Sequence, residues 1–216
     1  GADKVHIIAH SMGGLDARYM IVKLGMADKV ASLSTIGTPH LGTYFADWGI
    51  ARGGDDLIDF MRIFKIDLEG FEDRTTEACE ARDKQFEPHE ARNAVAYAAF
   101  YAYQSKKAVV GVLQPSWSII HQRQGKNDGL VPVSSAKWKS WRVDGQHRKK
   151  ILQEQVPFRA DHLNETGWWE PNELTTLKYW KPGSWLWHFR FRRRVRKLYK
   201  RIAKTALRRS RESTSR

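Results

Sequence analysis

The chain has 216 residues, 41% of them hydrophobic and nine of them tryptophan, a composition that excludes a disordered protein and allows one sizeable buried core. The single cysteine, Cys79, excludes an internal disulfide framework, and the longest apolar run, Ala94–Tyr103, is about half the length of a membrane-spanning helix. The net charge of +13 divides unevenly, because residues 184–216 hold thirteen Lys and Arg against one acid and leave +1 for residues 1–183. The neutral body and the basic tail therefore need separate interpretations.

Strand and helix patterns alternate at the start of the body. Val5–Ala9 and Val30–Ile36 are apolar runs typical of buried strands, and Gly14–Leu24 between them has apolar residues at helical spacing. This strand, helix, strand order favours an α/β protein with a parallel sheet and covering helices.

Further elements follow in chain order. Charge-rich helical patterns at Asp56–Phe64 and Arg74–Phe86 lie where an α/β protein would carry an insertion, at about residues 44–92. Trp117–His121 is interpreted as another strand, which ends in the turn-rich sequence GKNDGLVP, and Val156–Arg159 as a weaker last strand.

Ser11 follows the first strand directly, in the sequence AHSMGG. A serine hydroxyl becomes a nucleophile when a base accepts its proton and when a sharp strand-to-helix turn presents it to a substrate carbonyl. Such a turn needs small neighbours, which here are Ala9, Gly13 and Gly14. A serine that only caps the helix is the alternative that this stretch leaves open.

In an α/β fold with a serine nucleophile, the acid and then the base follow along the chain. Asp128 is the candidate acid, because it comes after Trp117–His121 and lies thirty-four residues before His162. Asp144 lies only eighteen residues before His162, which leaves little room for a helix, a strand and two loops. An ordinary Asp-Gly turn residue is the alternative interpretation of Asp128.

His162 is the candidate base, because it follows the last strand candidate. His147 lies in the polar sequence DGQHRKK, and His188 lies among aromatic residues of the tail, where contact with solvent or membrane is the simpler role. A loop histidine beside Asp161 is the alternative interpretation of His162.

Four stretches, HIIAHSMGGLDARY, STIGTPHLGTYFADW, RQGKNDGLVPVSSAKW and DHLNETGW, resemble the true lipases of the α/β-hydrolase superfamily. The resemblance is strongest to fungal triacylglycerol lipases of the mitochondrial kind and their bacterial relatives. It implies that residues 1–183 are the C-terminal portion of an α/β-hydrolase fold. It also implies that Ser11 is the nucleophile, Asp128 the acid that orients the imidazole, and His162 the general base and then the general acid.

The resemblance has further implications for the residues around the site. The segment after GTPHLG, about residues 44–92, is expected to form a lid over an acyl pocket, and His40 is expected to be structural. The backbone N–H of Met12 is the expected oxyanion donor. A second donor is expected from a loop upstream of residue 1, so the N-terminal part of the fold is expected to be missing.

The bacterial relatives hold the histidine loop with a calcium ion, and one ligand is an aspartate two residues after the histidine. Asn164 occupies that position here, which argues against the calcium ion, so we expect no cofactor and keep calcium as the alternative. Ala9 stands where a glycine is usual, and alanine is small enough for the turn.

Residues 184–216 are interpreted as a basic amphipathic tail. Aromatic residues come first, and apolar residues then recur at 195, 198, 199, 202, 203, 206 and 207 with Lys and Arg between them. Such a helix suits an anionic membrane or a lipid-droplet surface. Nucleic-acid binding and a solvated tail are the alternatives.

Together these patterns predict a serine ester hydrolase, a lipase that hydrolyses acylglycerol esters through an acyl-enzyme. A phospholipase or acyltransferase of the same fold is the alternative, because the triad does not choose the acceptor. An inactive fragment that binds membrane or nucleic acid through the tail is an alternative from another class. The resemblance suggests a mitochondrial or membrane-associated protein, while the residues themselves define neither compartment, acyl-chain preference nor oligomeric state.

Overall fold

The computed structural model describes residues 3–52, 68–167 and 184–214. Within these ranges four parallel strands form one sheet in the order β1-β2-β3-β6, and a separate antiparallel hairpin pairs β4 with β5. The strands are β1 (Val5–His10), β2 (Val30–Ile36), β3 (Ala96–Tyr101), β4 (Trp141–Asp144), β5 (His147–Lys150) and β6 (Leu152–Gln155). The predicted α/β architecture with a parallel sheet is confirmed.

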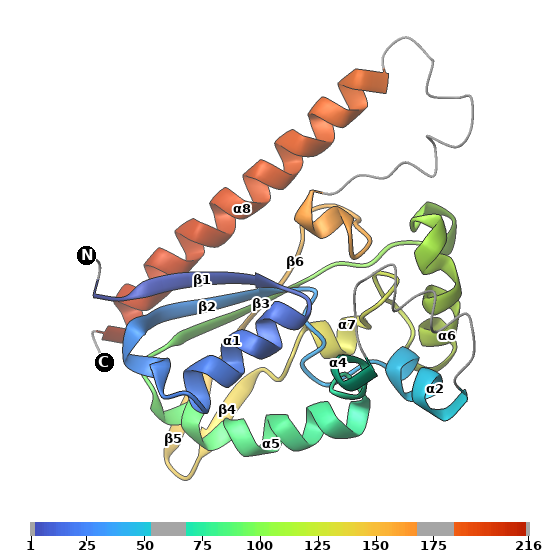
Figure 1. Ribbon diagram of the computed structural model, residues 1–216. Coiled ribbons are helices and arrows are strands. Elements are labelled where there is room, and N and C mark those ends of the chain that lie inside the picture. The colour runs from blue at the N-terminus through green and yellow to red at the C-terminus, as the bar shows by residue number, and fades with distance from the viewer. Residues whose placement is uncertain (1–2, 53–67, 168–183, 215–216) are drawn as a thin grey trace.

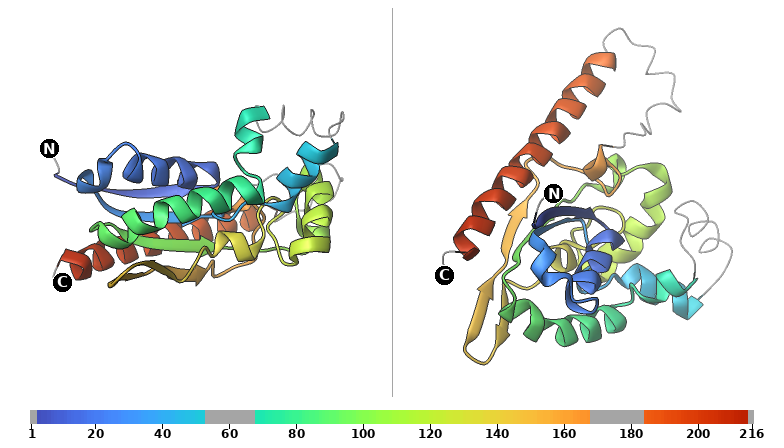
Figure 2. Two further views of the ribbon diagram at one scale, coloured as in Figure 1. Left: turned by 90° about the horizontal axis from the view of Figure 1, so that it is seen from below. Right: turned by 60° about the vertical axis from the view of Figure 1, so that its left-hand side comes forward.

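Helices cover both faces of the sheet (Figure 1). The long helices are α1 (Met12–Val22), α5 (Thr76–Arg92) and α8 (Ser184–Thr214), of which α1 and α5 lie on one face and α8 on the other (Figure 2). Shorter helices lie beyond the carboxyl ends of the strands: α2 (Tyr44–Arg52), α4 (Leu68–Glu72), α6 (Gln114–Gln124) and α7 (Val133–Ala136). Single 3-10 turns are η1 (Met26–Lys29), η2 (Lys106–Ala108), η3 (Gly111–Leu113) and η4 (Asn164–Thr166).

The central strand β3 is apolar on both sides because both faces of the sheet are buried. Tyr97 packs in one cluster with Ile21 of α1, whereas Phe100 packs in another with Leu198 and Ile202 of α8. Successive side chains of a strand point to opposite faces, so a strand covered twice is a continuous apolar run. No strand was predicted in this stretch.

The apolar stripe of the tail packs on the sheet. Val195, Leu198, Ile202 and Ala206 are buried against β1, β2 and β3, while Leu207 is 47% exposed. The predicted amphipathic helix is present, but the predicted separation of residues 184–216 from the body is wrong, because the sheet buries the stripe that was assigned to lipid. No helix in the described ranges has the length and hydropathy of a membrane span.

The strand predicted at Trp117–His121 is wrong, because these residues lie inside α6. Pro115 stands in the first turn, where its missing N–H costs nothing, and Ser116 and Ile120, four residues apart, are buried on one helical face. A short apolar run does not distinguish a strand from a buried helical segment.

The last strand also lies earlier than Val156–Arg159. It is β6, whose sequence LQEQ is polar because it forms the edge of the sheet beside β3 and is only partly buried. Just beyond it, the Val156 N–H donates to the Tyr101 carbonyl at 2.9 Å. His162 still follows the last strand, as predicted.

The described parts of residues 44–92 divide between the site and the body of the fold. α5 belongs to the body, where its buried carboxylates Asp83 and Glu90 pair with Arg18 of α1 at 2.9 and 2.7 Å. The helix predicted at Asp56–Phe64 lies outside the described residues. Of the described part, α2 and α4 are the elements near the predicted acyl pocket.

Candidate active site

Ser11 occupies a sharp turn between β1 and α1. Its φ of 53° and ψ of −132° lie outside the regions that L-residues favour, so surrounding contacts must hold the turn. The Ser11 N–H donates to the Ile36 carbonyl of β2 at 2.9 Å, and the Thr38 hydroxyl donates to the Ser11 carbonyl at 2.8 Å. The predicted strand-to-helix turn is therefore present, with Ser11 at the start of α1.

A close approach between α1 and the segment after β2 explains one of the two glycines. A Cβ on Gly14 would lie 2.2 Å from the Thr38 hydroxyl oxygen, whereas a Cβ on Gly13 would meet nothing within 4 Å. Gly14 therefore lets Thr38 reach the Ser11 carbonyl, and Gly13 has no such steric role.

The structure brings together the three residues predicted as nucleophile, base and acid. His162 Nε2 lies 2.8 Å from Ser11 Oγ, and His162 Nδ1 lies 2.8 Å from Asp128 Oδ2. Because one imidazole nitrogen faces a hydroxyl and the other a carboxylate, the ring can accept the serine proton while the carboxylate stabilises the imidazolium.

Asp128 is held by its own turn. Its Oδ1 accepts the amides of Leu130 and Val131 at 2.8 and 2.7 Å, which leaves Oδ2 for His162. The Asp128 carbonyl also accepts the His162 N–H at 2.9 Å. Asp128 is thus a turn residue and the partner of the imidazole at once, so the two interpretations of it are compatible.

The other candidates lie elsewhere. Asp144 in β4 forms an ion pair with Arg92 and pairs with His147 across the β4–β5 hairpin, so neither residue reaches Ser11. The side chain of His188 lies outside the described part of the chain.

His40 is buried in the core, away from Ser11. Its ring stacks on Trp138 with centroids 4.1 Å apart, and its Nε2 lies 2.8 Å from the Thr35 hydroxyl. Burial first, and then the Arg18 cation, hold the pKa of His40 well below its ordinary value. A neutral, stacked histidine fits the structural role that the resemblance implies.

A pocket of about 390 Å³ opens at Ser11 and His162. Much of its lining is apolar and comes from α2, α4 and the loops after Asp128 and His162: Phe45, Ala46, Phe71, Leu130, Val131 and Leu163. Polar side chains also line it: His10, Thr43, Arg74 and Thr166. Met12 also lines it and is the first residue of α1, where an N–H has no carbonyl one turn earlier to bond to. The Met12 N–H therefore has no acceptor within its own helix.

Two titratable residues that the sequence analysis missed touch the same site. His10 Nε2 lies 3.3 Å from the Glu165 carboxyl group, and the His10 ring centroid lies 4.5 Å from that of His162. Their positions in the sequence could have identified them, since His10 directly precedes Ser11 and Glu165 lies one turn after His162. Ligand atoms of His10, His162 and Glu165 lie within 4.8 Å of one another, but both nitrogens of His162 are already hydrogen-bonded, so a metal there would displace a hydrogen bond to Ser11 or Asp128.

The loop after His162 does not fit a calcium ion. The Asp161 carboxylate accepts the amides of Val110, Leu163 and Asn164 at 3.0, 3.1 and 2.9 Å. The Asn164 side-chain oxygen accepts the Asp161 N–H at 3.3 Å. Because main-chain N–H groups point at these oxygens, a cation would face donors there, and the hydrogen bonds themselves fix the loop.

The parallel sheet, the helices on both of its faces and the serine at the strand-to-helix turn define an α/β-hydrolase fold. Residues 1–60 match the model of the PGAP1-like alpha/beta domain. The chain is similar to triacylglycerol lipase 2 of Saccharomyces cerevisiae, with 30% identity over 175 residues, 77% of this chain and 48% of the relative. A triacylglycerol lipase of Pseudarthrobacter phenanthrenivorans is 54% identical over 48 residues, 22% of this chain and 14% of the relative.

Solved structures show the same fold. The mature lipase BlEst2 of Bacillus licheniformis has a TM-score of 0.54 at 19% identity, and the match covers 74% of this chain and 58% of that lipase. The Staphylococcus hyicus lipase has a TM-score of 0.50 at 19% identity, and the match covers 75% of this chain and 62% of that lipase. The chain spans about half the length of the yeast relative and much less of the bacterial one.

The contact between Gly14 and Thr38 predicts an asymmetry between adjacent glycines. Gly14→Ala should lower the free energy of unfolding by about 1–3 kcal/mol, because the new methyl group overlaps Thr38. Gly13→Ala is the matched control and should be neutral or slightly stabilising, because alanine is the better helix former. Thermal or denaturant unfolding checks both, and equal effects would contradict the packing described.

Proposed function

We propose that this chain carries the nucleophile, acid and base of a serine ester hydrolase that cleaves acylglycerol esters. The observation that supports it most is the hydrogen-bonded series Ser11, His162 and Asp128 at the mouth of an apolar pocket. The likeness to proteins named triacylglycerol lipases supports the same class of substrate.

In the acylation step, His162 Nε2 accepts the hydroxyl proton of Ser11 while Oγ bonds to the ester carbonyl carbon. The carbonyl oxygen becomes an oxyanion, which the Met12 amide stabilises as one donor. The imidazolium, paired with Asp128, then gives its proton to the alcohol oxygen as the C–O bond breaks. The glycerol product leaves, and an acyl-enzyme remains.

Deacylation repeats these steps with water. His162 accepts a water proton, the hydroxide oxygen bonds to the acyl carbon, and the proton returns to Ser11 Oγ as the carboxylic acid leaves. The apolar pocket holds the acyl chain through both steps. If an alcohol in place of water accepted the acyl group, the same residues would make the protein an acyltransferase. If the substrate were a glycerophospholipid, they would make it a phospholipase.

Removing any triad residue should reduce ester hydrolysis by several orders of magnitude. Ser11→Ala and His162→Ala should each lower kcat on the order of 10⁴-fold or more, and Asp128→Asn on the order of 10⁴-fold, because the three act as one unit. The double variant of Ser11 and His162 should be hardly worse than either single variant. Turnover of a short-chain soluble ester by the full-length protein measures these losses.

Asp144→Asn is the matched control for Asp128→Asn and should leave turnover nearly unchanged, since Asp144 lies in the hairpin. A silent Asp128→Asn with a damaging Asp144→Asn would overturn the assignment of the acid. Full activity of Ser11→Ala would overturn the proposed function itself.

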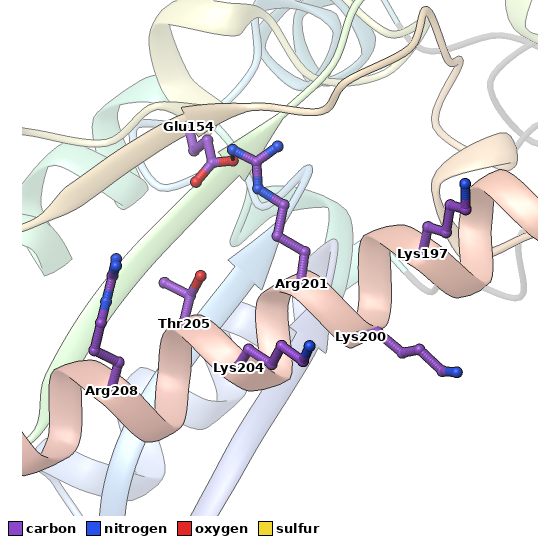
Figure 3. Close-up of a pocket in the computed structure, with 7 residues that line it drawn as sticks. All are labelled: Glu154, Lys197, Lys200, Arg201, Lys204, Thr205 and Arg208. Atoms are coloured by element: carbon purple, nitrogen blue, oxygen red, sulfur yellow. Dashed lines mark ion pairs between the residues drawn. The ribbon is translucent and has the colours of Figure 1, made fainter.

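We also propose that the basic face of α8 binds an anionic lipid surface. A hollow of about 590 Å³ lies between α8 and β6, and Figure 3 shows the side chains that line it. They are Glu154, Lys197, Lys200, Arg201, Lys204, Thr205 and Arg208, of which Glu154 is paired with Arg201. Because the apolar stripe of α8 is buried, this attraction is electrostatic and involves no insertion of that stripe.

A lipid surface is favoured over nucleic acid because a lipase must reach an ester at such a surface. Changing Lys197, Lys200 and Lys204 together to Gln should weaken binding to phosphatidylserine vesicles on the order of 100-fold at low salt, at about 1 kcal/mol per lysine. The matched control removes the same charge elsewhere, at the exposed Lys84, Lys106 and Lys107. Equal losses in the two triple variants, or tighter binding to DNA than to vesicles, would contradict the proposal.

A further inference from the structure

Glu165 is a carboxyl group with no part in the steps above, yet it lies beside them. Its side chain is 0% exposed, and neither oxygen has a well-formed hydrogen bond to another described residue. A Cβ on Gly37 would lie 2.1 Å from Glu165 Oε2, so the glycine after β2 leaves the space that this carboxyl group fills. The fold therefore makes room for a buried acid at this place.

The surroundings of Glu165 disfavour a negative charge on it. The titratable groups that face it are the acids Asp128 and Asp161, the phenol of Tyr199 from α8, and the imidazoles of His10 and His162. An ionised carboxylate without hydrogen bonds is very costly to bury, and a second acid nearby adds repulsion. The neutral acid form avoids both costs.

His10 is the complementary partner. Its Nε2 is buried, lacks a well-formed hydrogen bond to another described residue, and is the nitrogen 3.3 Å from Glu165. The same ring contacts the His162 ring, with centroids 4.5 Å apart. A proton on Glu165 would give both the Glu165 carboxyl group and His10 Nε2 a hydrogen-bond partner, because an O–H can donate to an unprotonated Nε2.

We propose that Glu165 is a neutral carboxylic acid whose O–H donates to His10 Nε2, and that this pair positions His162. The inference rests on the proposed function, since positioning matters only if His162 is the base. With Nε2 as acceptor, the ring proton of His10 is on Nδ1. Both residues then carry no charge throughout the reaction.

A neutral Glu165 also spares the imidazole of His162 a second neighbouring negative charge. Asp128 already places one carboxylate on the imidazole, and a second ionised carboxyl group would favour the imidazolium. The neutral pair supplies packing and a hydrogen bond without that charge.

The pKa shifts of the two groups agree with the geometry. Burial first, and then the charges of Asp128 and Asp161, raise the pKa of Glu165 well above its ordinary value, with the Ala102 amide opposing. Burial first, and then the neighbouring His162, lower the pKa of His10 to about 3. Both directions favour the neutral form of the group, the acid for Glu165 and the imidazole for His10.

Substitutions that keep or remove a neutral donor test the pair. Glu165→Gln retains an N–H donor for His10 and should keep kcat within about threefold, with an unchanged pH profile. Glu165→Ala and His10→Ala should lower kcat about 10- to 100-fold while KM changes little, because His162 loses its support. Glu80→Gln, at an exposed position, is the matched control for the charge change.

Two kinetic outcomes would overturn the proposal. If Glu165→Gln is as damaging as Glu165→Ala in variants that melt like the parent, the ionised carboxylate is required. If all three variants behave like the parent, the pair does not position His162.

Infrared spectroscopy gives a readout that needs no activity. The infrared difference spectrum between the parent and Glu165→Gln at pH 7 should contain the carbonyl band of a protonated carboxylic acid, because the variant lacks that group. Carboxylate bands in its place would show an ionised Glu165 and overturn the proposal. Because the band is observed whether or not the chain hydrolyses esters, this failure is distinguishable from failure of the proposed function.

Discussion

The strained turn at Ser11 is the constraint on which the site depends. A backbone with φ of 53° persists because the neighbouring strand and the segment after it hold the turn by hydrogen bonds to Ile36 and Thr38. Gly14 allows that approach. The turn fixes the Ser11 hydroxyl, and His162 and Asp128 are hydrogen-bonded in series from it.

A buried ionic cluster fixes the helix that begins at this turn. Arg18 of α1 pairs with Asp83 and Glu90 of α5, and Arg142 of β4 also pairs with Asp83 at 3.0 Å. These side chains are fully buried, so removing one partner would leave an uncompensated charge. The cluster therefore joins α1, α5 and the hairpin, and it makes α5 part of the body and not of a lid.

Local chemistry made part of the fold and site predictable from sequence. The strand, turn and helix around Ser11 and the sheet class follow from small residues at a turn and from alternating apolar patterns. Chain order pointed to Asp128 and His162 as partners of Ser11, although the strand expected before Asp128 is a helix. Other features depend on contacts between distant segments. Trp117–His121 has the composition of a strand but lies in a helix. The apolar stripe that contains Leu198 is buried by the sheet, which its own sequence does not indicate. The surroundings of Glu165 include side chains from distant parts of the chain, such as Asp128.

The central claim is that the turn, His162 and Asp128 together make Ser11 a nucleophile. Reaction with a fluorophosphonate tests it most directly, because the Ser11 oxygen would bond to phosphorus and displace fluoride only if its proton is accepted. Mass spectrometry of the digested protein should find the label on the peptide that contains Ser11, and His162→Ala should abolish labelling. A parent protein that stays unlabelled, or one labelled at a different serine, would contradict the account.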